Sequence, residues 1–177
     1  AFTSDDWGEN LDSARTYIFS RVAGASEPST YNWTLGSSSR WSVILQQFRN
    51  VDASIWDVAP SAASRAIAND GDATAEAPAI TIATAGAMGI VAMGDDLFPT
   101  TTTFSSVNNS YANTVSKAGQ QLSIMATKAN LSTGSTGVTT ITCSANVSYV
   151  IWQVALKPSS AATLEQEGFR WRDDNGS

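Results

Sequence analysis

The sequence predicts an all-β protein, an antiparallel two-sheet β-sandwich that is jelly-roll-like and has about nine strands. Three observations predict this class. Apolar and polar residues alternate in many short segments, and Gly, Ser and Asn separate these segments. No segment shows the apolar stripe of an ordinary amphipathic helix.

Residues 147–157 are the segment around which the chain is expected to be organised. Side chains alternate between the two faces of a strand. One face is strongly apolar and consists of Val150, Trp152, Val154 and Leu156. The second face is mixed and consists of Tyr149, Ile151, Gln153 and Ala155. Pro158 donates no backbone hydrogen bond and leads into a polar run, so the strand is expected to end there.

The first half of the chain is expected to open with a meander of three strands at residues 14–22, 31–35 and 40–51. Residues 50–57 are interpreted as a turn and a short extended piece. Residues 59–77 are rich in Ala, Ser, Asn and Asp and predict a long surface loop. The alternative is a short helix over 61–68, which has no amphipathic stripe.

The second half of the chain predicts further strands at residues 79–84, 86–93 and 120–128, and an edge strand with a loop over residues 98–116. Residues 86–93 are continuously apolar, which is typical of a buried strand. Residues 138–143 and 147–157 are expected to form a closing hairpin through 144–146.

Three parts are expected along the chain: an N-terminal arm (1–13), a β-sandwich domain (14–158), and a linker with a terminal strand (159–177). The chain opens at Ala1 without methionine, which predicts that a leader was removed or that the chain is a piece of something longer. The tail ends in the hairpin-turn signal Asp173-Asp174-Asn175-Gly176. We therefore expect either that the chain continues beyond Ser177 or that the tail pairs with another subunit.

Composition excludes several kinds of site. The chain has no histidine, which removes His-based triads and imidazole metal sites, and Cys143 is its one cysteine, expected to be a small core residue. The net charge is −6 and no basic cluster exists, so nucleic-acid binding is not expected. No apolar run is long enough to span a membrane.

Two acidic groupings are candidates for chemistry. Asp70 and Asp72, beside Gly71, have the oxygen density of a Ca²⁺ loop, but Ala77 stands where an EF-hand has its glutamate. A calcium site of another kind and a solvated turn remain as alternatives. Asp95-Asp96 and Asp173-Asp174 are poor acid/base pairs, because adjacent residues of a strand point to opposite faces. No catalytic residue is predicted.

Aromatic residues provide the candidate contact sites. Trp33, Trp41 and Trp152 fall on apolar strand faces, which predicts core positions. Trp7 and Trp56 lie near turns or a terminus and are candidates for contact with a neighbouring subunit or a glycan. Four further candidates come from the tail, where they alternate between two strand faces: Phe169, Arg170, Trp171 and Arg172.

Two stretches resemble known modules. A diffuse group of β-sandwich modules is resembled by six segments in order along the chain: Arg21-Val22-Ala23, Glu27-Pro28, Tyr31-Asn32-Trp33-Thr34, Phe48-Arg49-Asn50-Val51-Asp52, Ala77-Pro78-Ala79-Ile80 and Ala155-Leu156-Lys157-Pro158. These modules occur in tailed-phage structural proteins and in bacterial secreted surface proteins, and they share no catalytic motif. The tail from Leu164 to Ser177 resembles the opening of a second module of large bacterial surface and phage-like proteins. The resemblance implies a fibre, adhesin or virion component.

The expected function is therefore a non-enzymatic structural or assembly protein, best a phage virion component such as a capsid decoration or tail/fibre protein. Its expected partners are copies of itself or other structural subunits, and its expected location is the virion or the cell surface. The alternative is a carbohydrate-binding or adhesive module of a bacterial surface protein. A sandwich hydrolase with two carboxylates is a third alternative, which the missing histidine disfavours.

Overall fold

The computed structural model describes residues 3–9, 15–34, 41–68, 73–96, 102–117, 121–160 and 163–173. Fifteen strands lie in these ranges, more than the expected nine, and every described strand pair is antiparallel. The one helix among them is the three-residue 3₁₀ helix η1 (Ala62–Ser64). The predicted all-β class is confirmed, and no helix in the described ranges is long and apolar enough to cross a membrane.

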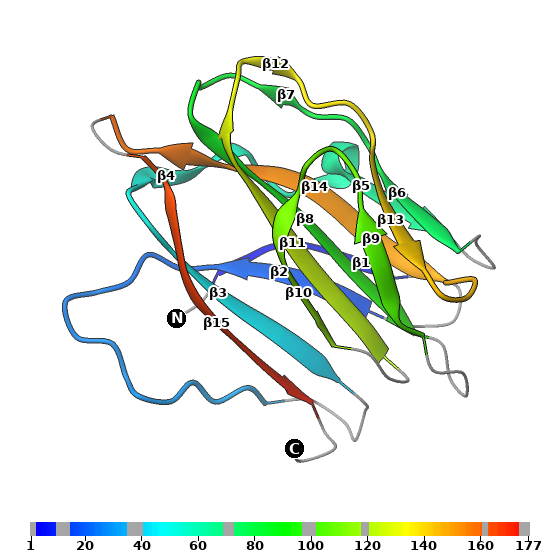
Figure 1. Ribbon diagram of the computed structural model, residues 1–177. Helices are drawn as coiled ribbons and strands as arrows, with labels where there is room; N and C mark the ends of the chain where they lie inside the picture. The colour runs from blue at the N-terminus through cyan, green and yellow to red at the C-terminus, as the bar shows by residue number, and fades with distance from the viewer. Residues whose placement is uncertain are drawn as a thin grey trace.

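A central sheet organises the molecule (Figure 1). Its strand order is β10 (Ala112–Lys117), β11 (Gln121–Leu131), β8 (Ala87–Asp96), β14 (Tyr149–Pro158) and β4 (Val51–Val58). The short strand β5 (Arg65–Ala68) also pairs with β14, beside its first residues. Strand β14 pairs with β8 from Tyr149 to Leu156, so it lies inside the sheet along its length.

A second sheet covers one face of the central sheet, as expected of a sandwich. It consists of β6 (Thr74–Ala77), β13 (Thr139–Cys143) and β9 (Phe104–Val107). A small ribbon of β7 (Thr81–Ile82) and β12 (Gly134–Ser135) lies beyond it. The core between the two sheets is aliphatic and includes Ala75, Ala77, Ile141 and Cys143 against Val91, Met93, Ile124 and Ile151. The jelly-roll strand order stays a prediction.

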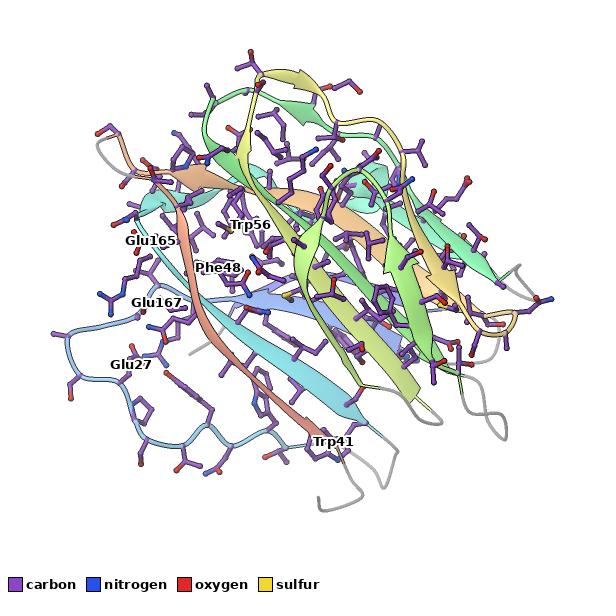
Figure 2. All side chains as sticks on the ribbon, viewed as in Figure 1. Glu27, Trp41, Phe48, Trp56, Glu165 and Glu167 are labelled. Carbon is purple, nitrogen blue, oxygen red and sulfur yellow. The ribbon has the colours of Figure 1, made fainter. Side chains whose placement is uncertain are left out.

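Two ribbons cover the other face of the central sheet (Figure 1). One is the hairpin of β1 (Thr3–Glu9) and β2 (Arg15–Ser20), and the other joins β3 (Ser42–Arg49) to β15 (Glu165–Asp173). A second core lies between these ribbons and the central sheet, and it includes Val150, Trp152 and Val154. Phe48 of β3 and Trp56 of β4, both labelled in Figure 2, pack against it. The central sheet is thus covered on both faces.

Double coverage explains why Tyr149 to Leu156 are all buried, although the sequence predicted one mixed face. Gln153 is completely buried towards the second sheet. In the amide orientation that satisfies its neighbours, Oε1 accepts from the hydroxyls of Tyr111 (3.0 Å) and Thr139 (2.9 Å), and Nε2 donates to the Pro78 carbonyl (2.7 Å). A buried amide is tolerated because its polar atoms have partners.

The predicted strand pairing was wrong in two places. Strand β13 pairs with β6 and β9 rather than with β14, because the chain crosses between the two sheets after Cys143. The expected N-terminal meander is also absent from the described residues, since β2 pairs with β1 and β3 pairs with β15. Residues 3–9, expected in an arm, form a strand.

Other segments also form strands that were not predicted. Residues 59–77 were predicted to be a long loop, but their described part contains η1, β5 and β6. The alternative helix over 61–68 is wrong beyond the single 3₁₀ turn. Residues 51–58, expected as a turn and a short extended piece, form strand β4. The predicted strands at 86–93 and 120–128 are confirmed as β8 and β11.

Four residues were predicted to lie in the core. Trp152 is fully buried, as predicted, and Trp41 is half-buried. Trp33 is 44% exposed, so its predicted core position is wrong; residues 31–34 are not a strand. Cys143 is buried as predicted, and burial, aided by the nearby Asp95 carboxylate, raises the pKa of its thiol to about 11.

Replacing Gln153 by alanine should lower the free energy of unfolding by about 2–4 kcal/mol, because buried hydroxyls and a carbonyl lose their partner. The matched control is Gln47→Ala on the exposed side of β3, which should cost less than about 0.5 kcal/mol. Urea denaturation of both variants measures the difference. Equal losses would contradict the role given to the Gln153 amide.

Candidate functional site

The hairpin β1–β2 is fixed to the central sheet by acidic side chains. Oδ2 of Asp6 accepts hydrogen bonds from the Trp152 indole (2.9 Å) and from the Arg65 guanidinium (2.9 Å). Oδ1 of Asp5 accepts from the Trp56 indole (3.3 Å). A charge-assisted bond to a mostly buried carboxylate is stronger than a neutral one, so β1 is docked firmly on β14.

Glycines allow the hairpin to lie directly on the sheet. A Cβ at Gly8 would overlap Val150 of β14, and a Cβ at Gly94 of β8 would overlap Thr16 of β2. At each position the glycine backbone lies against a side chain of the other layer, so there is no room for a larger residue. The inner face of the hairpin is determined by this fit, which leaves its outer face for other contacts.

The outer face of the hairpin carries exposed aromatic rings. Tyr17 and Phe19 of β2 are 45% and 40% exposed and stack with ring centroids 5.8 Å apart. Trp33, from the connection after β2, lies 5.4 Å from the Phe19 ring. We call Tyr17, Phe19 and Trp33 the aromatic row. It is the largest contiguous group of exposed aromatic side chains among the described residues.

A second cluster braces the connection that follows β2, which runs as a wide loop away from the sheets (Figure 1). Glu27 accepts hydrogen bonds from the Tyr31 hydroxyl and the Gly24 amide, and pairs with Arg21 at 3.2 Å. The Arg21 guanidinium also lies 5.7 Å from the Tyr31 ring centroid. The Tyr31 hydroxyl first, and then Gly24 and Arg21, hold the pKa of the Glu27 carboxyl below its ordinary value.

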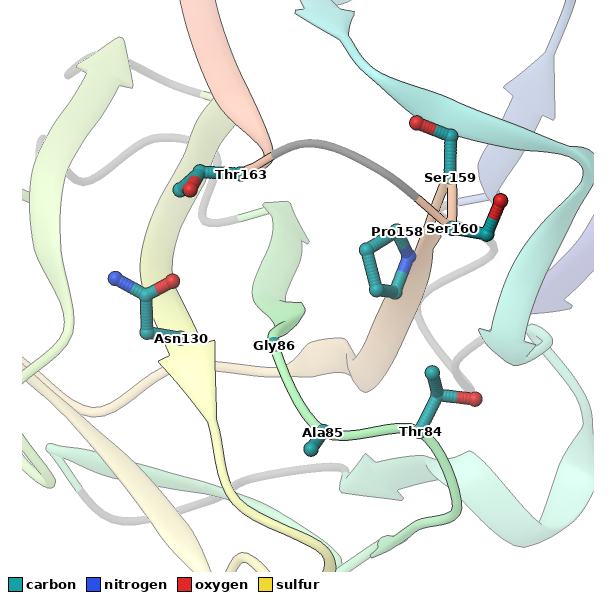
Figure 3. Close-up of a pocket in the computed structure, with 8 residues that line it drawn as sticks. All are labelled: Thr84, Ala85, Gly86, Asn130, Pro158, Ser159, Ser160 and Thr163. Carbon is teal, nitrogen blue, oxygen red and sulfur yellow. The ribbon is translucent and has the colours of Figure 1, made fainter.

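A shallow pocket of about 490 Å³ lies at one end of the central sheet (Figure 3). It is lined by eight small or uncharged residues: Thr84, Ala85, Gly86, Asn130, Pro158, Ser159, Ser160 and Thr163. These side chains offer hydrogen bonds but no ionisable group. The pocket therefore provides no general acid or base beside its serine hydroxyls.

The contact residues predicted from sequence lie in several places. Trp56 is half-buried in the layer between β1 and the central sheet, where it donates to Asp5. Trp7 pairs through its backbone with Tyr17. The backbone of residues 169–172 pairs with β3, from Phe169 opposite Gln46 to Arg172 opposite Val43. The structure does not describe the side chains of Trp7 and residues 169–172.

The remaining candidate, a Ca²⁺ site at Asp70 and Asp72, lies outside the described residues and stays a prediction. Within the ranges that the structure describes, no three residues among His, Cys, Asp and Glu gather in a way that could hold a metal ion.

Sequence reasoning missed the aromatic row. The signal was the alternation Arg15-Thr16-Tyr17-Ile18-Phe19-Ser20-Arg21, in which arginines share a strand face with Tyr17 and Phe19. Arginines at both ends of a face predict that this face is solvated, so the two rings between them should be exposed.

Comparisons with protein-family models, with curated proteins and with solved structures found no match for this chain. The resemblance to phage and bacterial surface modules stays a prediction.

Asp6→Ala should lower the free energy of unfolding by about 2–4 kcal/mol, because the Trp152 indole and the Arg65 guanidinium lose their shared acceptor. Exchange of the Trp152 indole proton, followed by NMR, should also become faster. The control is Asp52→Ala at the surface of β4, which should lower the free energy of unfolding much less, because its ion pair with Lys157 is exposed to solvent. An indole proton that exchanges at the wild-type rate in Asp6→Ala would contradict the docking of β1.

The Glu27 carboxyl should titrate below an ordinary glutamate in an NMR pH titration. Because its pKa in the folded state is lowered, its contacts are present above the unfolded-state pKa and are lost as the pH falls through the lowered value. Tyr31→Phe removes the largest cause and should raise the midpoint, whereas Tyr17→Phe should leave it unchanged. A midpoint that Tyr31→Phe does not move would refute the assigned cause.

Proposed function

We propose that this chain is a non-enzymatic structural subunit that works through contacts of its surface with other subunits, most specifically as a component of a phage virion. The observation that carries the proposal is the exposed aromatic row on a hairpin that is itself fixed to the core. Aromatic residues are enriched in protein interfaces and dominate their energetics.

The size of the aromatic row suits the centre of an interface. With about 200 Å² for each aromatic side chain, the exposed fractions leave roughly 250 Å² of ring surface in contact with water. A stable interface buries about 800 Å² on each partner. The row is therefore too small to be a whole interface, but it is large enough to supply the few residues that carry most of the binding energy.

The anchoring of the hairpin favours binding without rearrangement. Asp6 and the close fit at Gly8 and Gly94 hold the inner face of β1–β2 on the central sheet. The rings on the outer face are thus ordered before a partner arrives. An ordered surface loses less conformational entropy on binding, which leaves more of the contact energy as affinity.

The virion assignment, as capsid decoration or tail/fibre protein, draws its support from the sequence. It rests on the resemblance to tailed-phage modules and on a surface rich in Ser, Thr and Asn with only 15% charged residues. The proposed location is the virion or the cell surface. The proposal of a non-enzymatic role draws on the absence of histidine from the sequence and on the uncharged lining of the pocket.

The second candidate function is carbohydrate binding by an adhesive surface module. The same aromatic row favours it, since tyrosine and tryptophan combine an apolar ring with a polar group that can bind a sugar hydroxyl. The two functions differ in what binds the row: another protein subunit in the first, a glycan in the second.

Light scattering of the purified chain over a range of concentrations tests the proposal. We expect wild type to self-associate, and Phe19→Thr/Trp33→Thr to be monomeric with an unchanged unfolding temperature, because both rings are partly exposed. Val138→Thr removes an equally exposed apolar residue, 47% exposed, from the opposite side of the central sheet and should associate like wild type. A monomeric wild type that binds on a glycan array, with binding lost in Phe19→Thr/Trp33→Thr, would favour the second candidate.

A further inference from the structure

The shallow pocket in Figure 3 plays no part in the proposed assembly, although its walls are held in place by hydrogen bonds. Three segments form it: the turn before β8, the end of β11, and the connection that leads from β14 to β15. Hydrogen bonds join the first of these segments to the second, and the turn between β3 and β4 holds the third.

The turn before β8 is fixed to the end of β11. Within the turn the Ala87 amide donates to the Thr84 carbonyl (3.3 Å), and Gly86 has a φ of +85°, which glycine adopts without strain. The Gly86 amide donates to the Leu131 carbonyl (2.9 Å). The pairing of β11 with β8 shifts register just before Leu131, where Asn130 has a φ of +57°. A bulge of this kind turns a side chain out of the regular alternation, and here the Asn130 amide lines the pocket.

The connection after β14 is held at two places by Asn50, which lies in the turn between β3 and β4. The Ser159 amide donates to the Asn50 carbonyl (2.8 Å), and Nδ2 of Asn50 donates to the Thr163 carbonyl (2.8 Å). Ser159 and Thr163 are therefore positioned by the protein itself. A site whose walls are placed in advance loses less conformational entropy on binding.

The polar groups of the lining are all neutral, and each can both donate and accept hydrogen bonds. They are the hydroxyls of Thr84, Ser159, Ser160 and Thr163 and the amide of Asn130. In the part of the chain that the structure describes, none of these five side chains hydrogen-bonds to another residue. The Pro158 ring adds an apolar surface beside Gly86. The lining thus combines several available hydrogen-bonding groups with one small apolar face.

This lining fits a neutral saccharide better than other small molecules. A charged ligand is recognised by opposite charges, and no ionisable residue lines the pocket. An apolar ligand requires walls made mostly of hydrophobic side chains, whereas Ala85 and Pro158 are the apolar side chains here. A sugar ring has hydroxyls that pair with hydroxyls and amides, and C–H groups that pack on a proline ring. The volume of about 490 Å³ lies within the range of about 300–1,000 Å³ that is usual for small-molecule sites.

We propose that this pocket binds a short neutral saccharide, such as the end of a glycan chain. The inference goes beyond the proposed assembly and does not depend on it, because the pocket shares no residue with the aromatic row. It also differs from the second candidate function, in which the glycan binds the row. The site is shallow and its contacts are mostly hydrogen bonds in competition with water, so the dissociation constant should be on the order of millimolar.

The experiment follows the backbone amide signals of the whole chain by NMR while methyl glycosides of glucose, galactose, mannose and N-acetylglucosamine are added in turn. At least one of them should cause saturable shifts in residues 84–87, 130–131 and 159–160. Methyl glucuronide should bind more weakly than methyl glucoside, because no cation of the lining can pair with its carboxylate.

The test variant is Thr84→Val/Asn130→Gly, which removes two polar groups and keeps the backbone. Valine has nearly the shape of threonine, and glycine adopts the positive φ of Asn130 without strain. The affinity for the saccharide should fall about tenfold, because two hydrogen bonds are lost. The matched control, Thr30→Val/Asn146→Gly, makes the same changes at exposed positions outside the pocket and should bind like wild type.

Several results would overturn the proposal. They are the absence of saturable shifts with every glycoside, an unchanged affinity in the pocket variant, and methyl glucuronide binding as tightly as methyl glucoside. Shifts confined to residues 15–21 and 31–34, and absent from Phe19→Thr/Trp33→Thr, would place the saccharide on the aromatic row instead. Self-association of wild type changes none of these readouts, so the pocket and the proposed assembly are tested separately.

Discussion

Strand β14 is buried on both of its faces, and most of the fold can be understood as the means of covering it. Trp152 and Gln153 are neighbours in sequence, point to opposite faces and are both fully buried. Each brings a polar group that needs a partner. Tyr111 and Thr139 serve Gln153 on one side, and Asp6 serves Trp152 on the other. The chain therefore needs a layer on each face of its central sheet.

This constraint gives the N-terminal hairpin two different faces. The inner face contributes Asp6 and Gly8 to the covering of β14, so the hairpin is part of the fold. The outer face carries Tyr17 and Phe19, which are not needed to cover the core and stay exposed. An exposed pair of rings on an anchored strand is well suited to binding other subunits, and this division of roles connects the packing of the core with the proposed assembly.

The sequence predicted best where apolar residues form a continuous run or a clear alternation, as in β8, β11 and β14. It failed at β5 and β6, because alanine gives little strand signal and its burial depends on what packs against it. Pairing could not be predicted either, since β1 reaches Trp152 across 146 residues of sequence and β15 returns to β3. Trp33 lies beside Phe19 on the outer face rather than in the core, and this contact joins two segments that no local pattern connects.

The most direct test is amide hydrogen exchange at low and at high protein concentration. In the described sheets β2 pairs only with β1, so a partner bound at the outer face should slow exchange in residues 15–21 and 31–34. We expect the amides of these residues to exchange more slowly at high protein concentration, while the exchange rates in β14 and β8 stay the same. Protection confined to other segments, or slower exchange nowhere, would contradict the claim that the hairpin is the contact surface.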